Sequence, residues 1–408
     1  MKCELVDLIE CEQHINDRMR TSPPPRIPSE FLPEAAQEHP MLWVQLPASE
    51  VEIFRDHNRE SDSPLSVFRF EERGNVVYFP IHPLQIDRYH GHNIIESGRM
   101  KIIASYRTVL YEPDSTGPIR LNLRSGEKLM VKLHYDGSLP GIPGDRSLTR
   151  NKVAKCIAVS RELERLSTTN RLSPNLKIIR EEIGLVHENR GAIFRRIPGR
   201  PLIPGFSLHS TDRRFPHKDP LVLRLLKSVH GFSSNEAAEM FGELFATPLL
   251  TSLFSAFREG FSLEMHPQNV LIGFNESGLI DEVYYRDLEG VVFSNYWRRS
   301  VGLPKLFDDN DNPELHMFDK RIRRYFNRNL DHDLGRFWMN LIDVLRNVDY
   351  FQPKDVRTAV HSVRRAVRSA IRAFGLGRLA FWGRLLRFAP SPYGHWYSPG
   401  HYLRCYFR

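Results

Sequence analysis

Two polar clusters, each at the end of an apolar run, concentrate residue types that bind ligands. The first, EMHPQN, places four polar side chains within six residues: Glu264, His266, Gln268 and Asn269. The second, YYRDLEG, brings Asp287 eighteen residues after Asn269. Asn269 and Asp287 offer the oxygen ligands that Mg²⁺ prefers when it also holds nucleotide phosphates. We interpret the clusters as two halves of one nucleotide and metal site, with two internally satisfied loop networks as the alternative.

The other members of these clusters have less specific chemistry. His266 and Glu264 alternate on one face of an extended segment, where they can position a phosphate or an acyl group. Arg286 and Glu289 are ambiguous, because an ion pair inside the protein would explain both.

A third polar cluster offers the cations that a phosphate site needs. In the run ASYRTVLY, Ser105 and Arg107 are two residues apart, so a regular strand would place both on one face, with Thr108 next to them. A hydroxyl beside a guanidinium suits a phosphate or a carboxylate, since Arg offers a bidentate fork. Lys132 lies among apolar residues in the run LMVKLHY, where a lysine usually contacts an anion. A strand with one solvated face is the alternative for each feature.

Strands predominate in the half of the chain that would position the cations. Two hairpins are predicted, with turns at residues 74–75 and 189–191, because β-rich runs flank turn residues there. The runs KIIASYRTVLY and EKLMVKLHY predict two further strands, and residues 150–166 predict a helix.

The second half of the chain is predicted to be mostly helical, with a short β unit inside it. Ser233 and Glu236 form a capping box for a long helix that Pro248 should kink or split. A β unit with its turn at residues 275–278 then carries the polar clusters. The predicted fold class is therefore α+β, with a β-rich module followed by a helix-rich module that has an embedded β-hairpin.

The composition is that of a globular protein. The chain has 408 residues, 41% of them hydrophobic and 26% charged. No apolar run approaches the ~20 residues that span a bilayer, and the first residues lack the features of a signal peptide. Four scattered cysteines form no metal-binding spacing. We therefore expect a soluble protein in the cytoplasm.

The net charge of +8 arises at the C-terminal end. Residues 353–408 contain eleven Lys or Arg against one acid, so the preceding residues sum to about −2. Apolar residues recur there at helical spacing, which predicts an amphipathic helix with arginines on its other face. Packing of the apolar face on the body of the protein is favoured, and contact with a nucleic acid or a membrane is the alternative.

Six motifs in order resemble a known family. The segments FPIHPLQ, ASYRTVLY, VKLHY, SLTR, EMHPQN and YRDLEG, between residues 78 and 290, resemble those of siderophore synthetases that work independently of nonribosomal peptide synthetases (NIS synthetases), of the aerobactin-synthetase type. The resemblance implies a fingers-like ATP-binding module and a palm-like module. On this basis we divide the chain into an N-terminal segment (1–34), the fingers-like module (35–195), the palm-like module (196–352) and the basic C-terminal segment (353–408).

The resemblance also implies roles for particular residues. An ATP-dependent ligase of this type would activate a polycarboxylate such as citrate as an acyl-adenylate, and an amine or hydroxyl would then capture it. Arg107, Lys132 and His266 would be catalytic. The ATP site would consist of Ser105, Arg107, Thr108, Lys132, His266, Gln268, Asn269 and Asp287, with Mg²⁺ on Asn269 and Asp287. Glu264, Thr149, Arg150, His14 and Arg18 would lie on the substrate side.

The sequence departs from the family pattern at two places. Family members have a longer N-terminal domain, and HINDRMR keeps only the spacing of its last motif, in His14, Arg18 and Arg20. Val153 stands where the pattern has an arginine. We therefore expect a shortened synthetase, acting as a homo-oligomer or with a partner that supplies the missing domain. A non-catalytic relative that binds ATP and a kinase-like small-molecule phosphotransferase are the alternatives.

Overall fold

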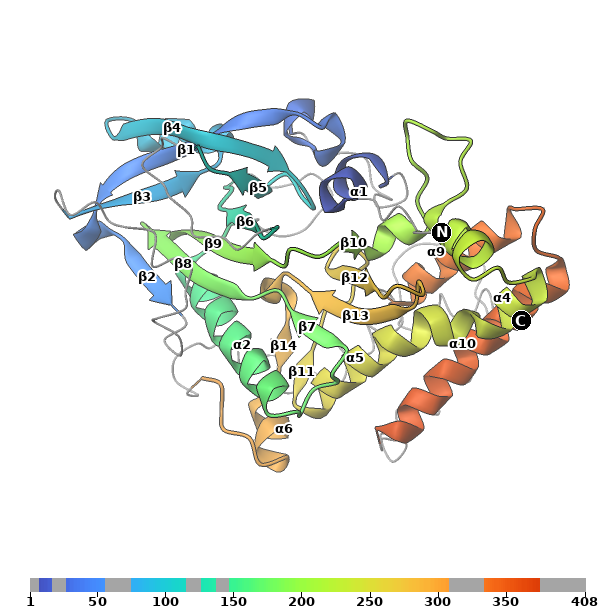
Figure 1. Ribbon diagram of the computed structural model, residues 1–408. Coiled ribbons are helices and arrows are strands. Elements are labelled where there is room, and N and C mark those ends of the chain that lie inside the picture. Colours follow the sequence, from blue (N-terminus) through green and yellow to red (C-terminus); the bar gives the residue numbers. More distant parts are fainter. Residues whose placement is uncertain are drawn as a thin grey trace, which may run out of the picture.

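The computed structural model describes residues 7–16, 27–55, 75–114, 126–136, 147–307 and 334–374 (Figure 1). Arg18, most of the predicted hairpin around residues 74–75 and the C-terminal segment from residue 375 lie outside these residues. Of that hairpin, the second strand is present as β3.

An antiparallel sheet forms the first layer, with its strands in the order β2-β8-β9-β6-β5-β4-β1-β3 (Figure 1). Its apolar face encloses a core that includes Trp43, Phe79 and Phe194. The register sets Thr108 opposite Lys132 and Glu181 beside Arg195, which fixes polar groups inside an otherwise apolar sheet. The strands are β1 (Glu38–Pro47), β2 (Glu52–Arg55), β3 (Val76–Ile81), β4 (Asn93–Ile102), β5 (Thr108–Glu112), β6 (Lys128–Leu133), β8 (Glu181–His187) and β9 (Arg190–Ile197).

The hairpin of β8 and β9 is confirmed, with its turn earlier than predicted. Glu188 and Asn189 form the turn, and both have positive φ (45° and 63°), as tight two-residue hairpin turns require. The predicted helix is also confirmed as α2 (Arg150–Thr168), which packs against this hairpin. Val153 of α2 lies so close to Gly184 and Gly191 that no side chain would fit at either glycine.

The polar clusters EMHPQN and YYRDLEG lie at the ends of strands in a smaller sheet. Its strand order is β10-β12-β13-β7, and the predicted turn at residues 275–278 joins β12 to β13, where the Gly278 N–H donates to the Asn275 carbonyl at 3.0 Å. The strand before this unit, β11, pairs with the strand after it, β14, in a separate two-stranded sheet. The strands are β7 (Leu176–Ile178), β10 (Ile203–Pro204), β11 (Phe261–Ser262), β12 (Val270–Phe274), β13 (Ile280–Tyr285) and β14 (Val292–Phe293).

The long helix of the second half is continuous across Pro248. The capping box of Ser233 and Glu236 is present, and α4 (Ser234–Phe241) runs through a π-helical turn at Gly242–Ala246 into α5 (Thr247–Arg258). Pro248 occupies the first turn of α5, where its missing N–H is tolerated after the π turn, so the predicted split does not occur.

That continuous helix is long and apolar enough to cross a membrane, contrary to the expectation from the apolar runs. However, 78% of its most apolar window is buried inside the protein, as in the core helix of a soluble protein. Among the described residues it is the one helix that passes this test.

The predicted basic helix is confirmed as α10 (Pro353–Ala373), which packs on α4, α5 and α9 (Gly335–Arg346) (Figure 1). Its apolar face, including Val356, Val360 and Val363, joins the larger hydrophobic core. The remaining helices and short helical turns are α1 (Leu8–His14), α3 (Leu221–Arg224), α6 (Asn295–Ser300), η1 (Ser29–Phe31), η2 (Pro33–Ala35), η3 (Ala48–Glu50), η5 (Pro83–Tyr89), η6 (Gly205–Leu208), η7 (Leu225–Val229) and η9 (Leu288–Gly290).

The architecture is α+β, as predicted. The larger core lies between the helices and the small sheet, and α2 contributes Val159, Leu163 and Leu166 to it. Helix α2 therefore contacts both sheets: it packs on β8 and β9 of the large sheet and on β7 of the small sheet. The fingers-like and palm-like modules and their boundaries stay predictions.

Candidate functional site

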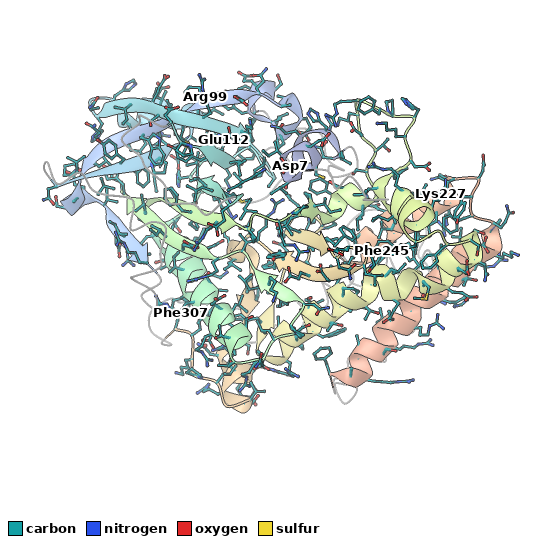
Figure 2. The ribbon with its side chains drawn as sticks, viewed as in Figure 1. Asp7, Arg99, Glu112, Lys227, Phe245 and Phe307 are labelled. Atoms are coloured by element: carbon teal, nitrogen blue, oxygen red, sulfur yellow. The ribbon has the colours of Figure 1, made fainter. Side chains whose placement is uncertain are left out.

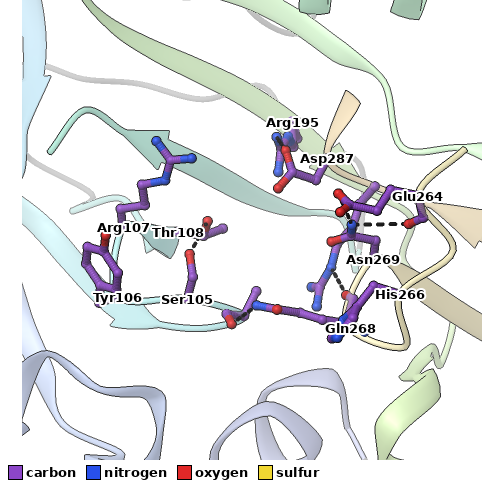
Figure 3. A pocket seen from close by; sticks show the side chains of 12 residues that line it. Ser105, Tyr106, Arg107, Thr108, Arg195, Glu264, His266, Gln268, Asn269 and Asp287 are labelled. Carbon is purple, nitrogen blue, oxygen red and sulfur yellow. Dashed lines mark hydrogen bonds and ion pairs between the residues drawn. The ribbon is translucent and has the colours of Figure 1, made fainter. Parts of the chain in front are cut away.

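A polar cavity of about 250 Å³ brings together polar groups from both sheets (Figure 3). One wall comes from the connection between β4 and β5, and the other from residues around β12 and β13. The lining residues are Ala104, Ser105, Tyr106, Arg107, Thr108, Arg195, Glu264, His266, Gln268, Asn269, Arg286 and Asp287. Eight of these are residues that the sequence singled out as ligand-binding.

The wall from the large sheet is a tight turn and not the continuous strand that the sequence predicted. β4 ends at Ile102, Ala104 adopts a left-handed conformation (φ 60°), and β5 begins at Thr108. Ser105 and Arg107 therefore do not share a strand face. The turn still presents both to the cavity, and the Ser105 and Thr108 hydroxyls lie 3.2 Å apart.

The opposite wall is the segment that joins β11 to β12. The Asn269 amide donates to the Glu264 carbonyl at 3.3 Å, and Nδ1 of His266 accepts the Gln268 N–H at 3.3 Å. The Gln268 side chain reaches across the cavity and donates to the Ala104 carbonyl. The two walls are thus in direct contact at one edge of the cavity.

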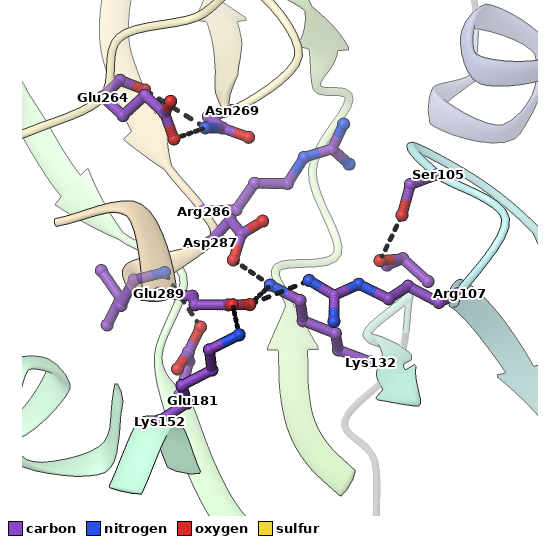
Figure 4. A network of polar contacts seen from close by, with 12 residues as sticks. Ser105, Arg107, Lys132, Lys152, Glu181, Glu264, Asn269, Arg286, Asp287 and Glu289 are labelled. Atoms are coloured by element: carbon purple, nitrogen blue, oxygen red, sulfur yellow. Dashed lines mark hydrogen bonds and ion pairs between the residues drawn. The ribbon is translucent and has the colours of Figure 1, made fainter. Parts of the chain in front are cut away.

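Asp287 follows β13 in a left-handed conformation (φ 75°), which is unusual for a residue other than glycine. Such backbone conformations cluster at functional sites, where the surrounding structure enforces them. Here Lys132 pairs with Asp287, and Arg195 pairs with it at 3.2 Å. These two contacts hold the carboxylate at the edge of the cavity: Arg195 lies beside Asp287 in Figure 3, and the contact with Lys132 is drawn in Figure 4.

An ion network extends from Asp287 to Glu289 (Figure 4). The Glu289 carboxylate pairs with Lys132 at 2.7 Å, with Arg107 at 2.9 Å and with Lys152 at 3.1 Å. Glu289 is therefore explained by ion pairs inside the protein. Arg286 does not take part in them and pairs with Glu12 instead. Lys132 itself lies behind the cavity wall and is nearly fully buried, with 2% of its side chain exposed.

This network keeps both acids ionised. Burial acts to raise the pKa of Asp287, but the charges of Lys132 and Arg195 outweigh it and hold the pKa well below its usual range. Burial likewise opposes the charge of Glu289, and the cations Lys132 and Arg107 lower its pKa well below the ordinary value. The site therefore combines fixed cations with fixed carboxylates in a poorly solvated region.

Sequence reasoning missed three residues of this region. Arg195 lines the cavity and donates to Glu181 at 3.0 and 2.7 Å, and both are nearly fully buried. Two adjacent arginines in the strand AIFRRI were a signal, because an arginine rarely faces an apolar core without an acidic partner. Lys152, at the start of α2, pairs with Glu289, and it directly precedes Val153, which stands where the family pattern has an arginine.

Several predicted substrate residues lie away from the cavity. Thr149 precedes the first turn of α2 as its N-cap, and Arg150 pairs with Glu52 on the exposed surface. His14 ends α1 and does not line the cavity. Among the described residues, no group of three or more His, Cys, Asp or Glu side chains could hold a metal ion by itself. A metal in this cavity would therefore need the Asn269 oxygen or ligand oxygens as well.

Solved structures identify the class of fold as that of the NIS siderophore synthetases. Aerobactin synthetase IucA from a hypervirulent Klebsiella pneumoniae pathotype has a TM-score of 0.64 at 16% identity, over 91% of this chain and 70% of IucA, and its ATP-bound form has a TM-score of 0.59. Petrobactin biosynthesis protein AsbB from Bacillus anthracis has 0.63 at 14% identity (93% and 70%). Aerobactin synthetase IucC from the same Klebsiella pathotype has 0.63 at 14% identity (99% and 77%). The resemblance seen in the sequence is confirmed at the level of the fold.

Residues 240–347 match a family profile described as ferric iron reductase FhuF-like transporter. This span covers about a quarter of the chain. A comparison with curated proteins finds no match.

Proposed function

We propose that this protein is an ATP-dependent ligase that activates a polycarboxylate such as citrate as an acyl-adenylate, in siderophore or related biosynthesis. One observation carries the proposal: hydroxyl and guanidinium donors from the β4–β5 turn and carboxamide and carboxylate oxygens around β12 and β13 line the same cavity. The fold of siderophore synthetases, one of them described as ATP-bound, supports it.

The residues of the cavity suit the first half-reaction. A carboxylate oxygen of the substrate would attack the α-phosphorus of ATP, forming the acyl-adenylate as the bond to pyrophosphate breaks. Arg107 and Arg195 would stabilise the negative charge that builds on the phosphate oxygens, and Ser105 and Thr108 would donate hydrogen bonds to them. Both guanidinium groups are held in place by ion pairs within the protein, Arg107 with Glu289 and Arg195 with Glu181.

The donor set also fits a magnesium ion. Asp287 and Asn269 present hard oxygen ligands on one wall, with Glu264 beside Asn269 (Figure 4). Mg²⁺, when bound, would neutralise the departing pyrophosphate. Asp287 would then exchange part of its interaction with Lys132 and Arg195 for the metal, which its low pKa permits.

In the second half-reaction an amine or hydroxyl would attack the acyl carbonyl, and AMP would leave with the electrons of the cleaved bond. His266, on the wall opposite Arg107, is placed to accept the proton of the nucleophile. Its Nδ1 accepts the Gln268 N–H at 3.3 Å, which helps to fix the orientation of the imidazole in the cavity wall.

The test is ATP-dependent release of pyrophosphate with citrate and related polycarboxylates, and hydroxylamine as the nucleophile. We expect release by the wild type and a loss of about 100-fold or more in Arg107→Ala and His266→Ala, the size of effect typical of lost transition-state stabilisation. Arg99→Ala is the matched control, because Arg99 is an exposed arginine of β4 in the same sheet (Figure 2).

The products separate this proposal from the alternatives. Formation of ADP in place of AMP and pyrophosphate would assign a phosphotransferase. ATP binding without turnover across the acid panel would assign a non-catalytic protein, or a subunit that needs a partner or a further domain. If Arg99→Ala and Arg107→Ala lose the same amount of pyrophosphate release, the cavity is not the site of the reaction.

A further inference from the structure

Helix α1 packs against β10 and η2 (Figure 1), and none of its residues lines the cavity. The helix is held firmly: Cys11 belongs to the larger core, the Ser207 hydroxyl donates to the Ile15 carbonyl at 2.9 Å, and the Arg213 N–H donates to the His14 carbonyl at 3.0 Å. Its Glu12 side chain is fully buried (0% exposed) and points into the protein. A buried carboxylate is costly unless several donors satisfy it.

The donors to Glu12 come from both walls of the cavity. Oε2 accepts the backbone N–H of Ala104, at 3.0 Å, and Oε1 accepts from the Arg286 guanidinium. Ala104 is the left-handed residue of the β4–β5 turn, and Arg286 immediately precedes Asp287. One carboxylate therefore contacts the turn that carries Arg107 and the strand end that carries Asp287.

These contacts close a ring around the edge of the cavity. Nε of Arg286 donates to the Gln268 carbonyl at 2.9 Å, and the Gln268 side chain donates to the Ala104 carbonyl. The ring thus runs from Glu12 to Ala104, Gln268, Arg286 and back to Glu12. Because each member is fixed by two others, the distance between the two walls is set by this ring.

One nitrogen of the Arg286 guanidinium makes no hydrogen bond to the described residues. Its guanidinium is buried, with 1% of the residue exposed, and it lines the cavity. Nε donates to Gln268 and Nη2 to Glu12, whereas Nη1 has no hydrogen-bond partner among the described residues. A buried guanidinium donor without a partner at a cavity wall is suited to an anionic ligand.

We propose that Glu12 is a positioning residue for the cavity: it holds the β4–β5 turn in place and orients Arg286 so that Nη1 is offered to a bound phosphate or carboxylate group. The identity of that ligand as ATP or its carboxylate co-substrate rests on the proposed function. The positioning itself does not, because the ring consists entirely of the chain's own residues.

The first test uses hydrogen exchange and needs no ligand. In Glu12→Ala, we expect faster amide exchange in peptides that cover residues 103–108 and 266–269, because the turn loses its external acceptor. The matched control is Glu162→Ala. Glu162 is a buried acid of α2 that pairs with Arg165 and Arg298 and does not line the cavity. It should leave exchange in those two peptides unchanged.

The second test measures the affinity for MgATP by calorimetry. Loss of hydrogen bonds to a charged group at each wall should weaken binding by about tenfold or more in Glu12→Ala. Glu12→Gln keeps an acceptor for the Ala104 N–H and loses the charge that holds Arg286, so its affinity should be intermediate. Glu162→Ala should bind MgATP as the wild type does, even if its melting temperature falls.

The outcomes are distinguishable. If exchange near residues 103–108 is the same in Glu12→Ala and the wild type, Glu12 does not position the turn and the proposal is wrong. If Glu12→Ala fails to fold, Glu12→Gln decides through its effect on Arg286: exchange in residues 266–269 should be faster than in the wild type, and unchanged exchange there would show that the proposal is wrong. If the wild type binds no MgATP, the proposed function fails, while the exchange experiment still tests Glu12.

Discussion

Lys132 illustrates how the site depends on single buried charges. Its ammonium pairs with Asp287 and Glu289 in a strand whose other neighbours are apolar. A buried cation that serves two carboxylates cannot be removed without leaving them less compensated. Its position in the sheet therefore contributes both to stability and to the charge of the cavity.

We expect Lys132→Met to destabilise the protein by about 3 kcal/mol, because it breaks a buried ion pair from one side. Urea unfolding monitored by circular dichroism would measure the change. Lys101→Met is the control: Lys101 pairs with Glu38 and Glu112, which are half exposed, so its loss should cost about 0–1 kcal/mol. A similar loss in both variants would contradict the importance of the buried network.

His82 makes the stability depend on pH. The side chain is fully buried; Nδ1 accepts the Leu84 N–H at 3.1 Å, and Nε2 donates to the Tyr106 carbonyl, at 2.9 Å, in the β4–β5 turn. Burial lowers the pKa of His82 from 6.5 to about 4, although the Tyr106 carbonyl opposes this. Between these two values the unfolded chain binds the proton and the folded protein does not, so stability falls as the pH falls.

The variant His82→Gln should remove this dependence, because Gln can keep the hydrogen bond to Tyr106 and does not titrate. Between about pH 7 and pH 4 the wild type should lose about 3 kcal/mol more unfolding free energy than the variant. Urea unfolding at several pH values gives the comparison. Parallel curves for the two proteins would show that His82 titrates normally.

At the scale of elements, the contact of α2 with the β8–β9 hairpin depends on glycine. A Cβ at Gly184 would lie 2.2 Å from Cγ1 of Val153, which is itself fully buried. Neither group has room to move, because the strand is hydrogen-bonded on both sides and the helix is anchored along its length. The helix that brings Lys152 to Glu289 is therefore seated by a small residue on the sheet.

We expect Gly184→Ala to destabilise the protein by about 1–3 kcal/mol through overpacking. Val153→Ala leaves a cavity and should also destabilise. In the double variant the new methyl group fills the space vacated by Val153, so the combined loss should be smaller than the sum of the single losses. Thermal unfolding of the four proteins tests this, and additive losses would contradict the close contact.

The elements were the most predictable part of the structure. Helix α2, the β8–β9 hairpin and the capping box of Ser233 follow from local periodicity and turn residues, and the structure confirms them. The run ASYRTVLY misled, because Ala104 carries no local signal for a left-handed turn; its conformation is held by distant groups. The π turn before Pro248 was likewise invisible in the pattern, since it depends on packing against α10.

At the scale of the whole molecule, the cavity lies between two sheets, which also share a small buried apolar cluster that includes Leu110 and Leu271. Arg107 belongs to the large sheet, and His266 and Asp287 flank the strands of the small one. The residue types of each half were readable in the sequence. Their partners Glu181 and Glu12 were not, because pairing across the fold leaves no spacing that a single sequence reveals.

A ligand that contacts both walls should stabilise the molecule as a whole. At a concentration 100 times its dissociation constant, MgATP would add about 2.7 kcal/mol by mass action and raise the melting temperature. Arg107→Ala and His266→Ala should each reduce this shift, because each removes one wall's contribution. Differential scanning fluorimetry measures it. A shift that persists in both variants would place the nucleotide elsewhere.

The long separation between the members of each buried pair also affects synthesis. Lys132 precedes Asp287 by 155 residues, and Glu12 precedes Arg286 by 274. At a translation rate of about 5–20 residues per second, Lys132 is synthesised roughly 8–30 s before its acidic partners. During that interval the large sheet cannot bury Lys132 without a large cost in free energy, because its carboxylate partners are absent. Chains that terminate before Asp287 should therefore be degraded in the cell and not accumulate as folded fragments.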